Sequence, residues 1–194
     1  MHIDISVESQ SILEVYATVP MVFENHSVYD VIQLQGSKQK LTLVERPLTD
    51  PFTKDYDAVD GDSPLTWSQQ FDLTNWGFIV ARNGSEIVGG ATIAHNTPDV
   101  NMLEGRLDLA VLWDIRVTPK FKGNQIGRKL FHSSERWAAS KGCQTLKIET
   151  QNNNVGACKF YVKMGCQLGT INRFAYPEFP DESQILWYKS LVAK

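Results

Sequence analysis

The sequence lacks the cysteines, the excess of positive charge and the long apolar runs that would assign it to several common protein classes. Its three cysteines (Cys143, Cys158 and Cys166) are odd in number and form no C-x-x-C pair, which argues against a disulfide framework and a zinc site. The formal net charge is −3, so the basic surface of a general nucleic-acid binder is missing. No apolar run approaches the roughly 20 residues that span a bilayer. We therefore expect no metal, no nucleic acid and no membrane among its partners.

The remaining composition is that of an ordinary folded protein. Hydrophobic residues make up 42% and charged residues 21% of the 194 residues, which is enough to bury a real core. The N-terminus, MHIDISVESQ, carries acids where a signal peptide has cations. These features predict a soluble, cytoplasmic protein, either a monomer or a homodimer.

One domain over 1–194 is predicted, and it has three parts. Residues 1 to about 46 are interpreted as an arm with an early strand or helix in SILEVYATV and a strand in KLTLVERP. The range 47–66 contains Pro47, Pro51 and Pro64 and is predicted to be a loop. The part from about 76 to 190 carries the motifs described below.

The loop at 47–66 is also acidic. Five aspartates face a single lysine, Lys54, in DPFTKDYDAVDGD, and a solvated loop is the simplest interpretation. The alternative hypothesis is a negative rim that draws a cationic acceptor. The aspartates are Asp50, Asp55, Asp57, Asp60 and Asp62.

Two strand regions have clear turn and stop signals. The segment from Phe78 to Ala94 is predicted to be a hairpin around Asn83-Gly84, a pair that suits a tight turn with positive φ. A second strand is predicted over 106–117, where Thr118-Pro119 stops it.

The following segments alternate between helix and strand. From Ile126, apolar residues recur at helical spacing until Gly142, which ends the helix. A strand over 145–150, a helix over 154–164 and a terminal β region ending in QILWYKSL follow. This alternation indicates an α/β domain.

The loop PKFKGNQIGRK, between the strand and the first of these helices, suits an anion. Five cations and no acid lie between Arg116 and Lys129, and Gly123 and Gly127 bracket the turn that opens the helix. A helix N-terminus presents unpaired N–H groups and about half a positive charge, so phosphate is favoured there. A basic loop with turn glycines is the plainer interpretation; the loop is neither a Walker A motif nor G-x-G-x-x-G. The cations are Arg116, Lys120, Lys122, Arg128 and Lys129.

The run ETQNNNVGACKFYVKMG raises the question of what three consecutive asparagines do between a strand and a helix. Asn154 is placed to be the helix N-cap, and Tyr161 follows two turns later on the same face. Glu149 lies near the end of the preceding strand. If this strand lies beside the strand over 106–117, these three residues face one cleft with the glycine loop, as in a nucleotide-like cofactor site. Alternatively, Glu149 pairs with Lys147 on the same strand face, and Tyr161 is a core aromatic.

Asp114 is a second candidate carboxylate. It alternates with Leu112 and Arg116 along its strand, so it could act as the base or bind the substrate amine. Pairing with Arg116 is the other interpretation.

Taken together, K-G-N-Q-I-G before a helix and E-x-x-x-x-N-x-x-A-x-x-x-Y-x-x-x-G resemble the GNAT superfamily of acetyl-CoA-dependent N-acetyltransferases, over roughly Trp76 to Lys189. The segments PFTKDYD and ETQNNNVGACKFY are similar to streptothricin acetyltransferases, and the spacing of Glu149, Asn154 and Tyr161 also resembles ribosomal-protein N-terminal acetyltransferases. The resemblance implies a mixed, mostly antiparallel central sheet flanked by helices, whose fourth and fifth strands splay apart around the pantetheine arm of acetyl-CoA.

The resemblance also implies roles for single residues. Glu149 would be the general base and Tyr161 the acid that protonates the leaving thiolate. Asp114 and Tyr176 (in Tyr176-Pro177) would bind the substrate. The cofactor-binding residues would be Ile115, Arg116 and Val117 through their backbone, then Lys122, Gly123, Asn124, Gln125, Ile126, Gly127 and Arg128 around the pyrophosphate, and Asn154.

Three positions depart from the family pattern. Lys122 stands where the family has Arg or Gln, and Cys166 where it usually has Phe. Gln125 replaces the first glycine of the motif, so a positive φ there would strain it.

The function implied is acetyl transfer from acetyl-CoA to a primary amine, of a small cationic molecule or of a peptide, by direct attack in a ternary complex. Cys158 has no histidine nearby in sequence and is better explained as a small core residue than as an acyl carrier. One alternative is acetylation of a protein N-terminus or lysine. A second, favoured only by Gln125, is a non-catalytic acyl-CoA-binding regulatory module.

Overall fold

The computed structural model describes residues 2–34, 41–58 and 63–192, which fall into two compact units. The first unit takes the residues up to Phe23, then Asp55–Lys147 and the residues from Ser190. The second takes Glu24–Lys54 and Ile148–Lys189. Asp60 and Asp62 of the acidic loop lie outside the described residues, as does the start of the strand predicted over 40–47.

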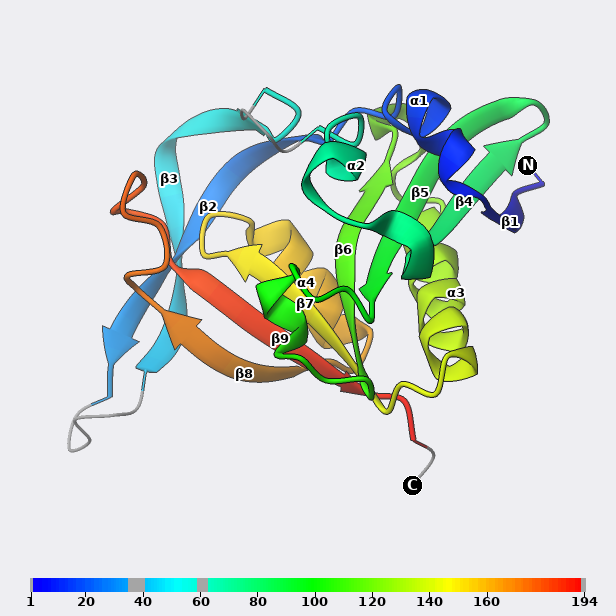
Figure 1. The fold of residues 1–194 in the computed structure, drawn as a ribbon. Helices are drawn as coiled ribbons and strands as arrows, with labels where there is room; N and C mark the ends of the chain where they lie inside the picture. The colour runs from blue at the N-terminus through cyan, green and yellow to red at the C-terminus, as the bar shows by residue number, and fades with distance from the viewer. Residues whose placement is uncertain (1, 35–40, 59–62, 193–194) are drawn as a thin grey trace. The chain divides into compact units, whose positions relative to one another are not determined.

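The first unit is built on four antiparallel strands in the order β1-β4-β5-β6 (Figure 1). The predicted hairpin is confirmed as β4 and β5, with its turn one residue later than expected. Asn83 pairs with Glu86, so Gly84 and Ser85 form the turn, and Gly84 alone of these has a positive φ, 63°. Glycine at the first central position is what a type II′ turn requires. The strands are β1 (Asp4–Glu8), β4 (Gly77–Asn83), β5 (Glu86–His95) and β6 (Leu109–Val117).

The strand predicted over 106–117 begins three residues later, as β6, and β1 was not predicted. Residues 106–108 form a bend in which Arg106 pairs with Asp108, at 2.9 Å between Nη2 and Oδ2. The stop at Thr118-Pro119 is confirmed, because β6 ends at Val117 and a short 3₁₀ turn follows. Asp4–Glu8 pairs with β4 over its whole length, a long-range contact that no local pattern announces.

Two neighbouring glycines of β5 show what covers each face of this sheet. A Cβ on Gly89 would lie 3.3 Å from the side chain of Leu130 in α3 (Ile126–Ser140). A Cβ on Gly90 would lie 2.2 Å from the ring of Tyr16 in α1 (Leu13–Tyr16). Successive strand residues point to opposite faces, so α3 covers one face and α1 the other. The predicted helix from Ile126 to Gly142 is thereby confirmed, and Gly142 has a φ of 83°.

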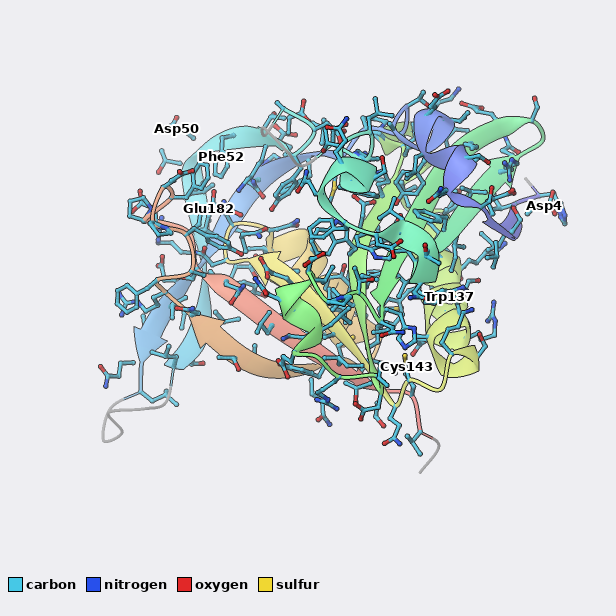
Figure 2. The ribbon with its side chains drawn as sticks, viewed as in Figure 1. Asp4, Asp50, Phe52, Trp137, Cys143 and Glu182 are labelled. Carbon is cyan, nitrogen blue, oxygen red and sulfur yellow. The ribbon has the colours of Figure 1, made fainter. Side chains whose placement is uncertain are left out.

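Aromatic side chains fill the α1 face. Trp67 lies 6.2 Å from Tyr16 and 6.1 Å from Trp76 between ring centroids, and Trp113 lies 5.3 Å from Trp76. On the α3 face, the half-buried Trp137 labelled in Figure 2 closes over Gly77, where a Cβ would be 2.4 Å from its ring. The remaining short helical segments of this unit are α2 (Trp67–Gln70) and the 3₁₀ turns Gln10–Ile12, Leu73–Asn75, Asn101–Leu103 and Pro119–Phe121.

A buried ion pair joins β6 to two distant segments of the first unit. The side chains of Arg116 and Asp114 are 1% and 4% exposed, and Nη2 of Arg116 lies 2.6 Å from Oδ2 of Asp114. Nη1 donates to Oδ1 of Asp57 at 2.8 Å and to the carbonyl of Val19 at 2.9 Å. Asp57 also accepts the backbone N–H of Met21 at 2.7 Å. Asp57 therefore pairs with a buried guanidinium, and its charge is not free to contribute to the hypothetical negative rim.

The phenol of Tyr16 completes this cluster. Its hydroxyl donates to Oδ1 of Asp114, and the guanidinium carbon of Arg116 lies 5.4 Å from its ring centroid. Burial opposes the charged form of Arg116, but the carboxylate of Asp114 outweighs it and raises the pKa of the guanidinium. Burial and the charge of Asp114 raise the pKa of Tyr16 well above its ordinary value.

The second unit contains a long two-stranded ribbon, β2 (Val22–Gln33) and β3 (Leu41–Asp55), the blue and cyan arrows of Figure 1. The prediction of a loop is wrong for 47–55, because β3 continues through Pro47 and Pro51. Both strands of a ribbon are edge strands, and both prolines are exposed, so neither removes a hydrogen bond from a central ladder.

The rest of the second unit follows the prediction closely. From Ile148 it includes the end of β7 (Thr145–Gln151), then α4 (Val155–Lys163), β8 (Gln167–Asn172) and β9 (Gln184–Ser190). The strand order is β7-β9-β8. The predicted α/β class is confirmed. None of the helices in the described ranges is long and apolar enough to cross a membrane.

We expect Asp114→Asn to lower the free energy of unfolding by about 3 kcal/mol, because it removes the nearest counter-charge of a buried guanidinium. The control is Asp108→Asn, whose pair with Arg106 is roughly half exposed and should cost below about 1 kcal/mol. Urea unfolding of both variants makes the comparison. Equal losses would contradict the assignment of Asp114 to a structural ion pair.

Candidate active site

The loop before α3 has the backbone shape of an anion site. Gly123 has a φ of 84°, and Gln125, the N-cap of α3, has φ 59° and ψ 12° in the left-handed region. A left-handed residue followed by right-handed helix turns successive N–H groups toward one concave point, and the first N–H groups of a helix have no intrahelical acceptor. Gln125 does adopt the positive φ that would strain a residue other than glycine, and it does so at a cost.

The side chains of this loop are arranged around its backbone. Asn124 donates from Nδ2 to the carbonyl of Phe121 at 3.1 Å, and Lys122 donates from Nζ to the carbonyl of Val22 at 3.1 Å. The first turn of α3 contains no acid and carries Arg128 and Lys129. The loop and the first turn of α3 therefore offer backbone donors and positive charge without an acidic side chain, which suits the pyrophosphate of a nucleotide-like cofactor. The specific role of each loop residue stays a prediction.

The predicted pantetheine strand is the end of β6. Ile115, Arg116 and Val117 pair with Ala91, Gly90 and Gly89 of β5. The register shifts where Trp113 lies between the paired positions Leu112 and Asp114, which marks a bulge just before this stretch. The side chain of Arg116 is committed to the buried cluster, so only its backbone is left for the predicted role.

Each of the three asparagines in the run has its own environment. Asn154 is the N-cap of α4, as predicted, with Oδ1 accepting the N–H of Ala157 at 3.0 Å. Asn152 is buried and bridges two segments: Nδ2 donates to the carbonyl of Tyr29 at 3.0 Å, and Oδ1 accepts the N–H of Ser183 at 2.7 Å. Asn153 is also buried. Asn152 and Asn154 are thus used for their side-chain amides, whereas Oδ1 of Asn153 is buried without a hydrogen-bond partner among the described residues.

Glu149 is held between two neutral donors. The hydroxyl of Tyr176 donates to Oε1 at 2.6 Å, and Nε2 of Gln184 donates to Oε2 at 2.7 Å. Tyr176 in turn accepts a hydrogen bond from Nε2 of Gln151 at 3.0 Å. The structure thus brings together two predicted site residues, Glu149 and Tyr176, which lie 27 positions apart. Sequence analysis missed Gln184 and Gln151, because no short motif links them to Glu149.

Glu149 does not form the ion pair with Lys147 that was the alternative interpretation of its position. Lys147 is buried in the first unit, where Nζ donates to Oε1 of Glu104 at 2.7 Å and to the carbonyl of Met102 at 3.1 Å. Glu149 is therefore the carboxylate on β7 whose partners are uncharged, which suits a group that accepts a proton.

Asp114 and Tyr161 are both buried. Asp114 bonds to Arg116 and Tyr16. It thus has the pairing with Arg116 that was the alternative to a role as base or substrate ligand. Tyr161 is 4% exposed and lies in an edge-on contact with Phe160, at 5.3 Å between ring centroids. Their roles in substrate binding and acid catalysis stay predictions.

The cysteines have the environments of core residues. All three are free and buried. Burial raises the pKa of the Cys158 thiol to about 11, which disfavours the nucleophilic thiolate. Within the described ranges, the side chains of His, Cys, Asp and Glu form no group of three that could hold a metal ion.

Two relatives resemble this chain over different shares of its length. It is 30% identical to a streptothricin acetyltransferase from Escherichia coli over 169 residues, which are 85% of this chain and 86% of the relative. A shorter match, 28% over 81 residues, covers 42% of this chain and 54% of a protein from Bacillus subtilis (strain 168) assigned as a [ribosomal protein bS18]-alanine N-acetyltransferase.

The fold is shared with a solved structure from Bacillus anthracis str. Ames, a protein described as a streptothricin acetyltransferase in complex with acetyl coenzyme A. The TM-score is 0.75 at 21% identity, over 97% of this chain and 99% of that one. The family model described as "Acetyltransferase (GNAT) family" matches residues 43–166, so the match begins well before Trp76 and includes most of β3. The chain belongs to the GNAT family of acetyltransferases.

Proposed function

We propose that this acetyltransferase uses acetyl-CoA to acetylate a primary amine of a small cationic molecule, and that streptothricin is the acceptor to test first. The observation that carries the proposal is the carboxylate of Glu149, held at the strand end by Tyr176 and Gln184 without a cation beside it. The acceptor is suggested by the relative from Escherichia coli, which matches most of the chain at 30% identity.

Acetyl-CoA would be bound by the loop before α3, the end of β6 and the N-terminus of α4. The backbone N–H groups from Gly123 to Arg128 would hold the pyrophosphate, since the left-handed Gln125 turns them toward one point. By family analogy the backbone of 115–117 would pair with the pantetheine arm, and Asn154 would hydrogen-bond the cofactor. Acetyl-CoA supplies the acetyl group as a thioester.

Deprotonation of the amine is the first task of the protein. An amine with a pKa near 10.4 is about 3.4 units from its free base at pH 7, a deficit of about 4.6 kcal/mol. Glu149 would accept this proton. Tyr161 would donate the proton that the leaving sulfur takes up.

Direct transfer in a ternary complex is favoured over an acyl-enzyme. The alternative would require a cysteine thiolate, and the buried Cys158 has a pKa of about 11. In this proposal Glu149 is the final acceptor of the amine proton and Tyr161 donates the proton to the leaving sulfur, while the cofactor-binding residues bind and orient.

A protein N-terminus is the second candidate acceptor. The observation that favours it is the 28% identity, over 81 residues, with the protein assigned as a ribosomal-protein alanine N-acetyltransferase. A bulky peptide and a small cation make different demands on the acceptor site, so the two candidates can be separated by experiment.

A panel of amines tests the proposal directly. Purified protein with acetyl-CoA is given streptothricin, a peptide with an N-terminal alanine and a lysine-containing peptide blocked at its N-terminus, and CoA release is measured. We expect the highest kcat/KM with streptothricin. Faster turnover of the alanine peptide would favour the second candidate, and turnover of none would overturn the proposal.

Gly127→Asp should weaken CoA binding by well over tenfold, because it places a side chain and a negative charge at the proposed phosphate site. Titration calorimetry with CoA measures the change, with circular dichroism as the check on folding. Unchanged affinity in a folded variant would refute this placement of the phosphates.

Glu149→Gln should lower kcat/KM for the acceptor by roughly 10²–10⁴, because an amide cannot accept the amine proton. Tyr161→Phe should lower kcat by a similar order, about 10²–10⁴, and leave acetyl-CoA affinity nearly unchanged. Steady-state kinetics across pH provides both readouts. Wild-type kinetics in Glu149→Gln would remove this residue from the mechanism.

A further inference from the structure

A pocket of about 560 Å³ lies within the second unit, between β2 and the connection from β8 to β9. This volume falls in the range of small-molecule sites. Tyr29 and Asp30 contribute from β2, and Arg173, Tyr176 and Asp181 from the connection. The pocket therefore has aromatic walls and two carboxylates against one guanidinium.

Two contacts hold the walls of this pocket together. Asn152, itself a lining residue, joins Tyr29 of β2 to Ser183 at the start of β9 through both ends of its side-chain amide. Lys54 of β3 contacts both carboxylate oxygens of Glu182 at 2.6 Å, and their side chains are each 17% exposed. Figure 2 labels Glu182 on the connection and Phe52 on the neighbouring stretch of β3. The ribbon thus forms a fixed wall of the pocket.

The lining suits a positively charged ligand. Carboxylates and aromatic faces both attract a cation. Asp30 already pairs with Arg46, at 2.8 Å between Oδ2 of Asp30 and Nε of Arg46. The side chain of Arg46 is 55% exposed and that of Asp30 is 40% exposed. In the described part of the chain Asp181 forms no ion pair, and it is exposed to solvent, so its carboxylate is available to a ligand.

Tyr176 is the link between this pocket and Glu149. Tyr176 lines the pocket, its hydroxyl donates to Oε1 of Glu149, and Glu149 is not among the lining residues. The other carboxylate oxygen accepts a hydrogen bond from Gln184, an amide that cannot pass a proton on. A phenol can donate one proton while accepting another, and a donor from the pocket would take the place of Nε2 of Gln151, which now donates to Oη of Tyr176.

We infer that this pocket binds the cationic acceptor and that Tyr176 relays the proton of its amine to Glu149. The inference rests on the proposed function. The acceptor ammonium gives a proton to Oη of Tyr176 while the proton of Tyr176 passes to Oε1 of Glu149. The products are a neutral amine ready for acyl transfer, an unchanged phenol and a protonated carboxyl, which returns its proton to solvent after turnover.

Tyr176→Phe tests the relay, with streptothricin as the acceptor. The aromatic ring is kept, so KM for the acceptor should change by less than about threefold, while kcat falls by about 10²-fold, as for loss of acid–base catalysis. The lost rate should return as pH rises, because solution then supplies the free amine. The matched control is Tyr188→Phe, the same chemical change on β9 outside the lining, which should keep wild-type kcat.

A double variant separates a relay from a structural role. If Tyr176 and Glu149 act in one path, Tyr176→Phe with Glu149→Gln should be no slower than the slower single variant. Multiplied losses, or wild-type kcat in Tyr176→Phe alone, would overturn the relay.

Charge changes of opposite sign test the pocket as the acceptor site. Asp181→Asn should raise KM for streptothricin by about two- to fivefold, the size of an exposed charge pair, and Arg173→Gln should lower it. Glu178→Gln, an exposed carboxylate on the same connection that does not line the pocket, is the control and should leave KM unchanged. General damage to the fold cannot produce the two opposite shifts.

Different results would overturn the pocket assignment and the proposed function. If the wild-type enzyme acetylates amines and the KM of Asp181→Asn and Arg173→Gln equals that of the wild type, the pocket assignment is overturned and the proposed function stands. A wild-type enzyme that acetylates no amine overturns the proposed function and the pocket assignment together.

Discussion

The buried guanidinium of Arg116 is the interaction on which the first unit depends. A charge with 1% exposure must be neutralised inside the protein, and its partners come from three separated segments: Asp114 on its own strand, the carbonyl of Val19 and the carboxylate of Asp57. The segment after α1 and the segment after β3 are thereby fixed to the strand that leads into the glycine loop. Removing any of these partners leaves the buried guanidinium with an unpaired N–H group, so the cluster acts as one unit.

In the second unit a neutral side chain has the comparable task. Asn152 binds a carbonyl of β2 with its amide nitrogen and an N–H at the start of β9 with its amide oxygen. Only a side chain with both a donor and an acceptor on a short stem can serve both backbones from the end of β7. Two residues later, the corresponding side-chain oxygen of Asn154 caps α4. The same residue type thus ends a strand, joins two segments and begins a helix.

The chemistry divides in a way that follows from these two clusters. The loop before α3 offers backbone N–H groups and positive charge, which suit a polyanion whatever its remaining structure. The second unit offers a carboxylate with neutral partners and a pocket with aromatic and acidic walls, which suit an amine. Binding of a phosphate needs many equivalent donors, whereas recognition of an acceptor needs a few particular side chains. In the proposed acceptor site, β2 of the ribbon contributes Tyr29, Asp30 and Val31 to the pocket lining.

What the sequence determined by itself is local. The β4–β5 hairpin, the helix from Ile126 and the cap at Asn154 follow from neighbouring residues, and the motif spacing identified the family correctly. Only the tertiary structure decided the rest: that Asp4–Glu8 is a strand, that β3 continues through two prolines, that Asp114 is committed to Arg116, and that Tyr176 and Gln184 hold Glu149. Each of these depends on a partner far along the chain. A periodic pattern records which way a side chain points, but the group that it meets is set by how distant segments pack.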